Sequence, residues 1–123
     1  MPFDRGALGV DVSRPLSEIK ADLFKALGHP ARVRALEVLA ERELSVGELQ
    51  PLVGIESSHL SQQLGVLRRS GLVTTRKEGS SVIYALKDPL VAELLVVAKR
   101  LLLTVLAETR GLLDGLSAEV DAR

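Results

Sequence analysis

The spacing of hydrophobic residues changes twice along this chain, and that change restricts its fold more than any other feature. Apolar residues recur at helical intervals up to about residue 70 and again from Asp88 onward. Between these parts, the stretches 72–77 and 81–86 are rich in β-forming residues and are joined by Glu78-Gly79-Ser80, which predicts one hairpin. The sequence therefore predicts a mainly α-helical protein with a small β-hairpin.

Start and stop signals divide the helical parts into five segments. Proline suits the first turn of a helix and glycine its end. Ser45 with Glu48 three residues later predicts a capping box, and Asp88 before Pro89 predicts another helix start. Together these signals predict helices over approximately residues 15–27, 30–42, 46–52, 57–70 and 88–113.

The length and composition fit one domain. The chain has 123 residues, of which 46% are hydrophobic and only 2% are aromatic, so its core must be built from Leu, Val and Ala. A chain of this length supports a single core. We expect a flexible arm at residues 1–14, one domain at residues 15–116 and a flexible tail at residues 117–123.

Neither a secretory signal nor a membrane anchor is predicted. Residues 1–9 carry charges and lack an apolar run, and the most apolar stretch, 90–107, is interrupted by Glu93, Lys99 and Arg100. Cys is absent, which excludes disulfides, thiolate metal sites and cysteine nucleophiles. We therefore expect a cytoplasmic protein that does not associate with a membrane.

Charge is balanced over the whole chain but not along it. Sixteen basic residues match sixteen acidic residues. Residues 57–87 nevertheless hold five Lys or Arg against one Asp or Glu, and no acidic residue lies between Ser57 and Lys77. A local basic patch between two mildly acidic segments favours a polyanionic partner such as DNA.

The order of the predicted elements is that of a winged helix-turn-helix. A tight turn, Val53–Glu56, joins the third helix to the fourth, and in this fold the helix after the turn enters the major groove. At about 100° per residue, Leu60, Leu64 and Leu67 share one face of the fourth helix. That face is expected to contact the core, and the polar face opposite to it to contact DNA.

The residues that we predict to contact DNA fall into three groups. Small or hydrogen-bonding side chains suit base edges, cations suit phosphates, and the hairpin tip can reach a neighbouring groove. Any solvated helix also has a polar face, but the local absence of acidic residues favours DNA binding. The predicted contacts are Ser57, Ser58, His59, Ser61 and Gln62 early in the fourth helix, Arg68 and Arg69 at its end, Arg76 and Lys77 on the hairpin, and Ser80 and Ser81 at its tip.

The fifth helix is apolar on more than one face, so one small core cannot cover it. The simplest partner for such a helix is the same helix in a second copy of the chain. We therefore predict a homodimer, with the first helix assisting, whose interface contains Leu94, Val97, Leu101, Leu102, Val105 and Leu106.

Three motifs resemble the ArsR/SmtB family of bacterial transcriptional repressors. They are Phe24–Arg32 continuing into Leu36–Leu39, Ser57–Leu64 with Leu67–Val73, and Arg76–Tyr84. The resemblance extends from about Leu16 to Leu113. It implies a homodimer whose first and last helices pair, whose fourth helix enters the major groove and whose hairpin is a wing. It also implies a repressor that leaves its operator, expected to be an inverted repeat, when an inducer binds.

The metal sites of the family are not matched. Many relatives bind metal through a Cys-x-Cys-Asp-Leu run, where this sequence has Ser45-Val46-Gly47-Glu48-Leu49, and others use Asp and His on the last helix, which here lacks His. His29 is expected to cap or pack a helix, and His59 to contact DNA. We therefore predict no metal and no cofactor, and leave open a small-molecule effector, a protein effector or none.

Catalysis is not predicted. The serines have no Asp or His partners in triad-like roles, and no glycine-rich phosphate loop is present. The alternative to DNA binding is a protein-interaction or antirepressor module that keeps this fold. The polar fourth helix and the hairpin favour the DNA-binding interpretation.

Overall fold

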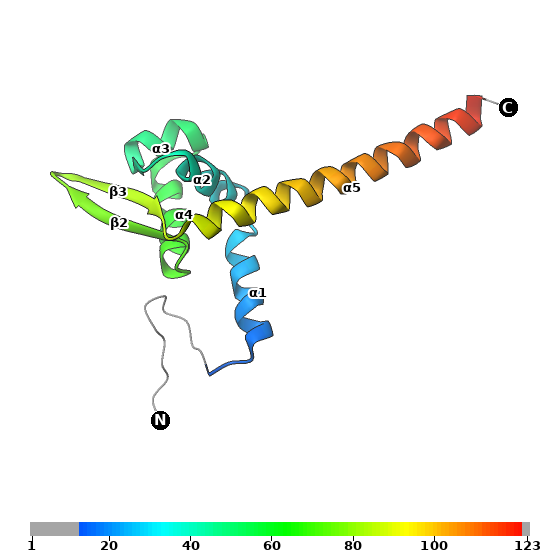
Figure 1. Ribbon diagram of the computed structural model, residues 1–123. Coiled ribbons are helices and arrows are strands. Elements are labelled where there is room, and N and C mark those ends of the chain that lie inside the picture. The colour runs from blue at the N-terminus through cyan, green and yellow to red at the C-terminus, as the bar shows by residue number, and fades with distance from the viewer. Residues whose placement is uncertain (1–12, 122–123) are drawn as a thin grey trace. The chain divides into compact units, whose positions relative to one another are not determined.

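The computed structural model of the protein describes residues 13–121. Its chain divides into two compact units, Met1–Ala92 and Glu93–Arg123, which are described separately. The predicted arm lies outside the described residues except for Ser13 and Arg14. The elements in chain order are α1 (Leu16–Leu27), α2 (Pro30–Glu41), β1 (Leu44–Ser45), α3 (Val46–Val53), α4 (Ser57–Arg69), β2 (Val73–Glu78), β3 (Ser81–Leu86) and α5 (Pro89–Asp121) (Figure 1).

Side-chain caps start three of the helices, as the sequence predicts. At the start of α5, Asp88 Oδ1 accepts a hydrogen bond from the Leu90 N–H at 2.8 Å. The Nδ1 atom of His29 accepts a hydrogen bond from the Ala31 N–H at 3.1 Å, so His29 caps α2. Ser45 and Glu48 form the predicted capping box, in which each side chain accepts a backbone N–H of the other residue. These bonds satisfy donors that a helix start leaves unpaired, which explains why the three helices begin where they do.

Leucines dominate the core of the first unit. Three of them, Leu60, Leu64 and Leu67, lie on α4 and are fully buried, which confirms the predicted inner face of that helix. Burial of each such side chain contributes about 1.5–3 kcal/mol. The inner face of α4 is therefore held by the core, and its opposite face is left to solvent. The largest fully buried side chains of the described residues are Leu36, Leu44, Leu49, Leu60, Leu64 and Leu67.

The predicted hairpin is part of a three-stranded antiparallel sheet, in the order β1-β3-β2. The additional strand β1 pairs Leu44 with Tyr84 and Ser45 with Ile83. It was not predicted because two residues cannot display the alternation that reveals a strand. The predicted hairpin is confirmed, with β2 shifted by one residue, and its turn contains Gly79 at a φ of +64°.

The second unit is a single helix, the part of α5 after Ala92. The helix continues to Asp121, past the end predicted at Leu113, because its apolar spacing persists and neither Gly111 nor Gly115 adopts a positive φ. Residues 117–121, predicted as part of a tail, are therefore helical, and residues 122–123 lie outside the described residues. None of the described helices is long and apolar enough to span a membrane.

Candidate nucleic-acid interface

A tight turn joins α3 to α4. Val53 ends α3, Gly54 follows with a φ of +82°, and Glu56 precedes α4. The side-chain amide of Gln50 donates a hydrogen bond to the Ile55 carbonyl at 2.8 Å, so the turn is held from within α3. A positive φ is unstrained only for glycine. The predicted turn is thus confirmed, and Gly54 is the residue that makes it possible.

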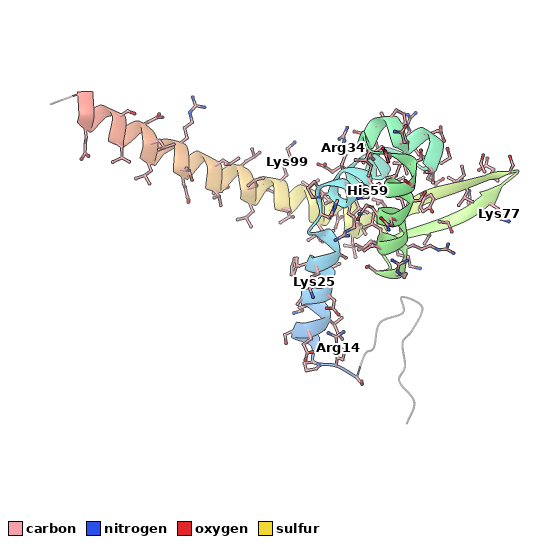
Figure 2. All side chains as sticks on the ribbon, turned by 180° about the vertical axis from the view of Figure 1, so that it is seen from behind. Arg14, Lys25, Arg34, His59, Lys77 and Lys99 are labelled. Carbon is pink, nitrogen blue, oxygen red and sulfur yellow. The ribbon has the colours of Figure 1, made fainter. Side chains whose placement is uncertain are left out.

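The polar face of α4 lies in solvent, opposite the buried leucines. The side chain of Glu56 makes no hydrogen bond to the start of α4, so the first-turn N–H groups can donate to an anion such as a phosphate. Figure 2 shows His59 on this helix. All five residues predicted to meet bases in the first half of the helix are exposed, namely Ser57, Ser58, His59, Ser61 and Gln62.

A cation lies along the same face of α4. Arg68 and Arg69 are exposed in the last turn. Arg69 folds back over Gly65, since a Cβ atom added at Gly65 would lie 3.1 Å from Arg69 Nη1. Residues three and seven positions after Gln62 lie near it on a helix surface. The guanidinium of Arg69 therefore extends the polar face of Gln62 with a positive charge.

The β2–β3 hairpin, called the wing below, projects from the helices of the first unit (Figure 1). Its register pairs Arg76 with Ile83 and Lys77 with Val82. Because successive side chains of a strand point to opposite faces, the two cations lie on opposite faces of the wing. Lys77 shares its face with the buried Val73 and lies in the outer half of the wing (Figure 2). The predicted tip residues, Ser80 and Ser81, are both exposed.

The charge of Arg76 is compensated within the chain. Its Nη1 atom lies 2.8 Å from Glu43 Oε1 and its Nη2 atom 3.1 Å from Glu78 Oε2. The hydrogen bond to Glu43 is the main reason that the pKa of Arg76 is raised above its ordinary value. Among the described residues no carboxylate forms an ion pair with Lys77. Lys77 is therefore the more available cation of the wing.

From Val96 to Leu116, the leucine and valine side chains of the second unit are exposed. Leu101 is 65% exposed, and at about 100° per residue the predicted interface residues fall within about half of the helix circumference. Leu103, which is 55% exposed, lies outside that half. The predicted interface residues are Leu94, which is half-buried, and Val97, Leu101, Leu102, Val105 and Leu106, which are exposed.

The two histidines come together, although they are far apart in the sequence. The ring centroids of His29 and His59 are 6.2 Å apart, in an edge-to-face arrangement. The Nδ1 atom of His29 already accepts the Ala31 N–H. Within residues 13–121, no group of three or more His, Cys, Asp or Glu is placed to hold a metal ion.

Two residues beside the interface were not predicted. Gln63 is only 9% exposed, and its Oε1 atom accepts a hydrogen bond from Arg32 Nη1 at 2.9 Å. The burial of Gln63 could have been predicted from the sequence, because Gln63 lies three residues after Leu60 and four before Leu67, on the side of α4 that faces the core. The partner, Arg32, lies 31 residues earlier in the chain, and no pattern within α4 indicates it.

Comparisons with known proteins agree on one family. The family model described as "Bacterial regulatory protein, arsR family" matches residues 29–75, which contain α2, α3 and α4. The uncharacterized HTH-type transcriptional regulator Rv0081 of Mycobacterium tuberculosis is 53% identical over 107 residues, covering 86% of this chain and 94% of that protein. The crystal structure of Rv0081 matches with a TM-score of 0.73 and 55% identity, over 77% of this chain and 96% of that chain.

Two further proteins extend the comparison. A biofilm growth-associated repressor of Agrobacterium fabrum is 40% identical over 94 residues, which are 76% of this chain and 80% of that protein. The solution structure of the homodimeric winged helix-turn-helix domain of Mb0332 from Mycobacterium bovis has a TM-score of 0.69 and 28% identity, over 76% of this chain and 86% of that chain. The chain therefore belongs to the arsR family of bacterial regulatory proteins, and it is a DNA-binding transcriptional regulator rather than an enzyme.

Proposed function

We propose that the protein is a cytoplasmic homodimeric repressor that binds an inverted-repeat operator. The observation that carries this proposal is the exposed face of α4, which is polar and free of carboxylates directly opposite three buried leucines. Such a face can enter a major groove without electrostatic repulsion, and the core on its other side keeps it rigid.

Residues of the interface have different roles in this proposal. Ser58 and Gln62 contact base edges, since Gln can pair bidentately with adenine and Ser can adapt to several bases. Arg69 and Lys77 contact phosphates, because neither forms an ion pair with a carboxylate of the described residues. Six of the remaining predicted contacts support the same surface: Ser57, His59, Ser61, Arg68, Ser80 and Ser81. Arg76 lies on the opposite face of the wing from Lys77 and is paired with Glu43 and Glu78.

The dimer is proposed from exposed apolar surface in each unit. In the second unit, the apolar half of α5 includes Leu101 and Leu102, which are more than half exposed. In the first unit, α1 leaves Leu16 and Phe24 65% and 62% exposed. A second copy of the chain would cover both surfaces and would present two copies of α4 symmetrically, which a two-fold operator requires. The homodimeric relative from M. bovis supports this assembly.

Repression is proposed from the relative in A. fabrum that is named a repressor. A dimer bound over a promoter prevents transcription, and an effector that favours the free form restores it. With no cysteine in the chain and no cluster of metal ligands among the described residues, we propose that any effector is a small molecule or a protein and not a metal ion.

Selection from random duplexes tests the proposal. The purified protein is incubated with a pool of random double-stranded DNA, the bound fraction is amplified and sequenced, and the resulting site is placed before a reporter gene. We expect an inverted repeat with half-sites about one helical turn apart, and lower reporter expression when the protein is present. An asymmetric single site would contradict the dimer on DNA, and increased expression would contradict repression.

A protein-interaction module on the same fold is the competing function, and the comparisons do not favour it. The relatives reported above are named transcriptional regulators or repressors. Recovery of no sequence at all from the random pool, by a protein shown to be folded, would support the competing function.

A further inference from the structure

Arg32 connects three helices of the first unit. From α2, its Nε atom donates to the Ala26 carbonyl at 2.7 Å, its Nη2 atom to the Lys25 carbonyl at 3.2 Å and its Nη1 atom to Gln63 Oε1 at 2.9 Å. The two carbonyls belong to the last turn of α1, and Gln63 belongs to α4. One guanidinium therefore connects the end of α1 to the helix that we propose to enter the major groove.

Each of these bonds has a clear physical basis. The last carbonyls of a helix lack partners in the regular helical pattern and carry partial negative charge, so a cation at the end of α1 is favourable. The Lys25 carbonyl also accepts the Gly28 N–H at 3.1 Å, and Arg32 donates to both the Lys25 and the Ala26 carbonyl. The planar guanidinium offers five donors in a fixed arrangement, so it can hold several acceptors at once in one orientation. Gln63 is nearly buried and would be costly to leave without a partner.

The contact with Gln63 differs from the other contacts that hold α4. Leu60, Leu64 and Leu67 bind through apolar burial, which has no preferred direction. Within residues 13–121, the hydrogen bond from Arg32 is the one that ties an α4 side chain to another helix. Apolar packing therefore holds the inner face of α4 against the core, and the Arg32 bond adds a directional restraint on the rotation of the helix.

Rotation of α4 matters because base readout depends on short hydrogen bonds. A helix with its side chains is about 10–12 Å across, so a turn of about 10° about its axis moves a side-chain end by about 1 Å. A hydrogen bond lengthened by that amount is lost. Gln62 is the immediate neighbour of Gln63, so a restraint on Gln63 also restrains the direction of Gln62.

We propose that Arg32 is a positioning residue for DNA recognition: by joining the end of α1 to Gln63, it fixes the rotation of α4 and so aligns Ser58 and Gln62 with the bases. This inference rests on the proposed role of α4 as the helix in the major groove. Arg32 itself is half-buried, and in this proposal it acts through Gln63 rather than by contacting DNA. Because Arg32 also bonds the last carbonyls of α1, a shift of α1 would change the position of α4.

The surroundings of Arg32 make it suitable for substitution. An open groove of about 330 Å³ is lined in part by Arg32, so water can enter when the side chain is shortened. The groove is lined by Asp22, Lys25, Ala26, Arg32, Val66 and Ser70.

The test compares four single variants, one control variant and one double variant with the wild-type protein. Arg32→Met and Gln63→Leu each remove one side of the bond at similar side-chain volume. Arg32→Lys keeps the charge but cannot hold three acceptors in one plane, and Gln63→Glu keeps an acceptor for Arg32. Arg42→Met, at the exposed end of α2, removes an equal charge as the control. Affinity for the selected operator and for a random duplex is measured by fluorescence anisotropy at several salt concentrations, at a temperature where each variant is folded.

We expect Arg32→Met, Arg32→Lys and Gln63→Leu to weaken operator binding about tenfold, which corresponds to one lost charge-assisted hydrogen bond. Binding to the random duplex and its dependence on salt should stay the same, because no phosphate contact is removed. The double variant Arg32→Met/Gln63→Leu should lose no more than either single variant, since both remove one interaction. Gln63→Glu and Arg42→Met should retain operator affinity.

Several results would overturn the inference. Equal losses on both duplexes with a flatter salt dependence would show that Arg32 contacts a phosphate. Lower thermal stability with unchanged operator affinity would show a purely structural role. If Gln62→Ala fails to reduce operator affinity, the proposed function of α4 fails as well. If Gln62→Ala reduces it but Gln63→Leu and Arg32→Lys do not, only the inference about Arg32 fails.

Discussion

Individual side chains on the α4 surface differ in what they can contribute to DNA binding. Uncharged groups such as Ser58 and Gln62 gain little from a phosphate but can match the hydrogen-bonding pattern of a base pair. Charged groups such as Lys77 bind any phosphate equally, so they add affinity without sequence information. Exposure alone does not distinguish a residue that reads bases from one that binds phosphates. The dependence of binding affinity on DNA sequence and on salt concentration does distinguish them.

Replacement of Gln62 by Ala is expected to reduce specificity. The loss on the selected operator should be about 1–3 kcal/mol per half-site, the cost of one good base contact, with little change on random DNA. Competition between the two duplexes in one titration measures the ratio directly. A uniform loss on both duplexes would mean that a different element lies in the groove.

Replacement of Lys77 by Ala is expected to weaken binding to both duplexes by similar factors. Each phosphate contact contributes about 0.9 to the slope of log affinity against log salt, so a symmetric dimer should lose about two units. Arg76→Ala is the matched control: it removes the same charge from the neighbouring position, but from the opposite face and from a pair of carboxylates. Its salt slope should change less than that of Lys77→Ala. The reverse order would show that the other face of the wing meets the DNA.

At the scale of helices and strands, local signals predicted most of the fold. Caps such as His29 and the pair Ser45 and Glu48 act within a few residues, so they are visible in the sequence and fix helix starts. The short strand β1 and the bond between Arg32 and Gln63 depend on residues distant in the chain, which no local pattern reveals. The exposed residues of the site were predicted from local patterns. The ion pair between Arg76 and Glu43 was not, because these two residues are 33 positions apart in the chain.

The capping box of α3 makes the stability of the helix-turn-helix depend on pH. The Ser45 N–H and hydroxyl both donate to the Glu48 carboxylate, at 3.0 and 3.1 Å, and the backbone bond is the main cause that lowers the pKa of Glu48 below its ordinary value of 4.5. A group with a lowered folded-state pKa stabilises the fold above its unfolded-state pKa, and this contribution is lost as pH falls through the folded-state pKa.

Glu48→Gln should therefore be less stable than the wild-type protein at pH 7, and the difference should decrease as the pH approaches 3. Glutamine can still accept a hydrogen bond at this position, so helix α3 itself should form in the variant. Urea unfolding of both proteins at a series of pH values measures the difference in free energy of unfolding. A difference that stays constant over this range would show that the carboxylate charge contributes nothing through the cap.

In the whole molecule, the apolar half of α5 needs a partner that covers it. Leu101 and Leu102 are 65% and 56% exposed in the single chain. Burial of such a side chain contributes about 1.5–3 kcal/mol, so several of them from each of two subunits exceed the cost of association. Operator binding depends on this assembly, because one subunit offers a single α4 and can occupy one half-site only.

Leu101→Glu is accordingly expected to produce monomers and to abolish binding to the inverted repeat, since a buried carboxylate without a partner is strongly unfavourable. Leu103→Glu is the matched control, because Leu103 is a similarly exposed leucine two residues along α5 that lies outside the proposed interface. Sedimentation equilibrium at micromolar concentration gives the mass, circular dichroism confirms folding, and anisotropy gives operator affinity for both variants. A wild-type protein that sediments as a monomer would contradict the proposed dimer. Equal effects of the two substitutions would instead show that the subunits meet through a different face of the helix.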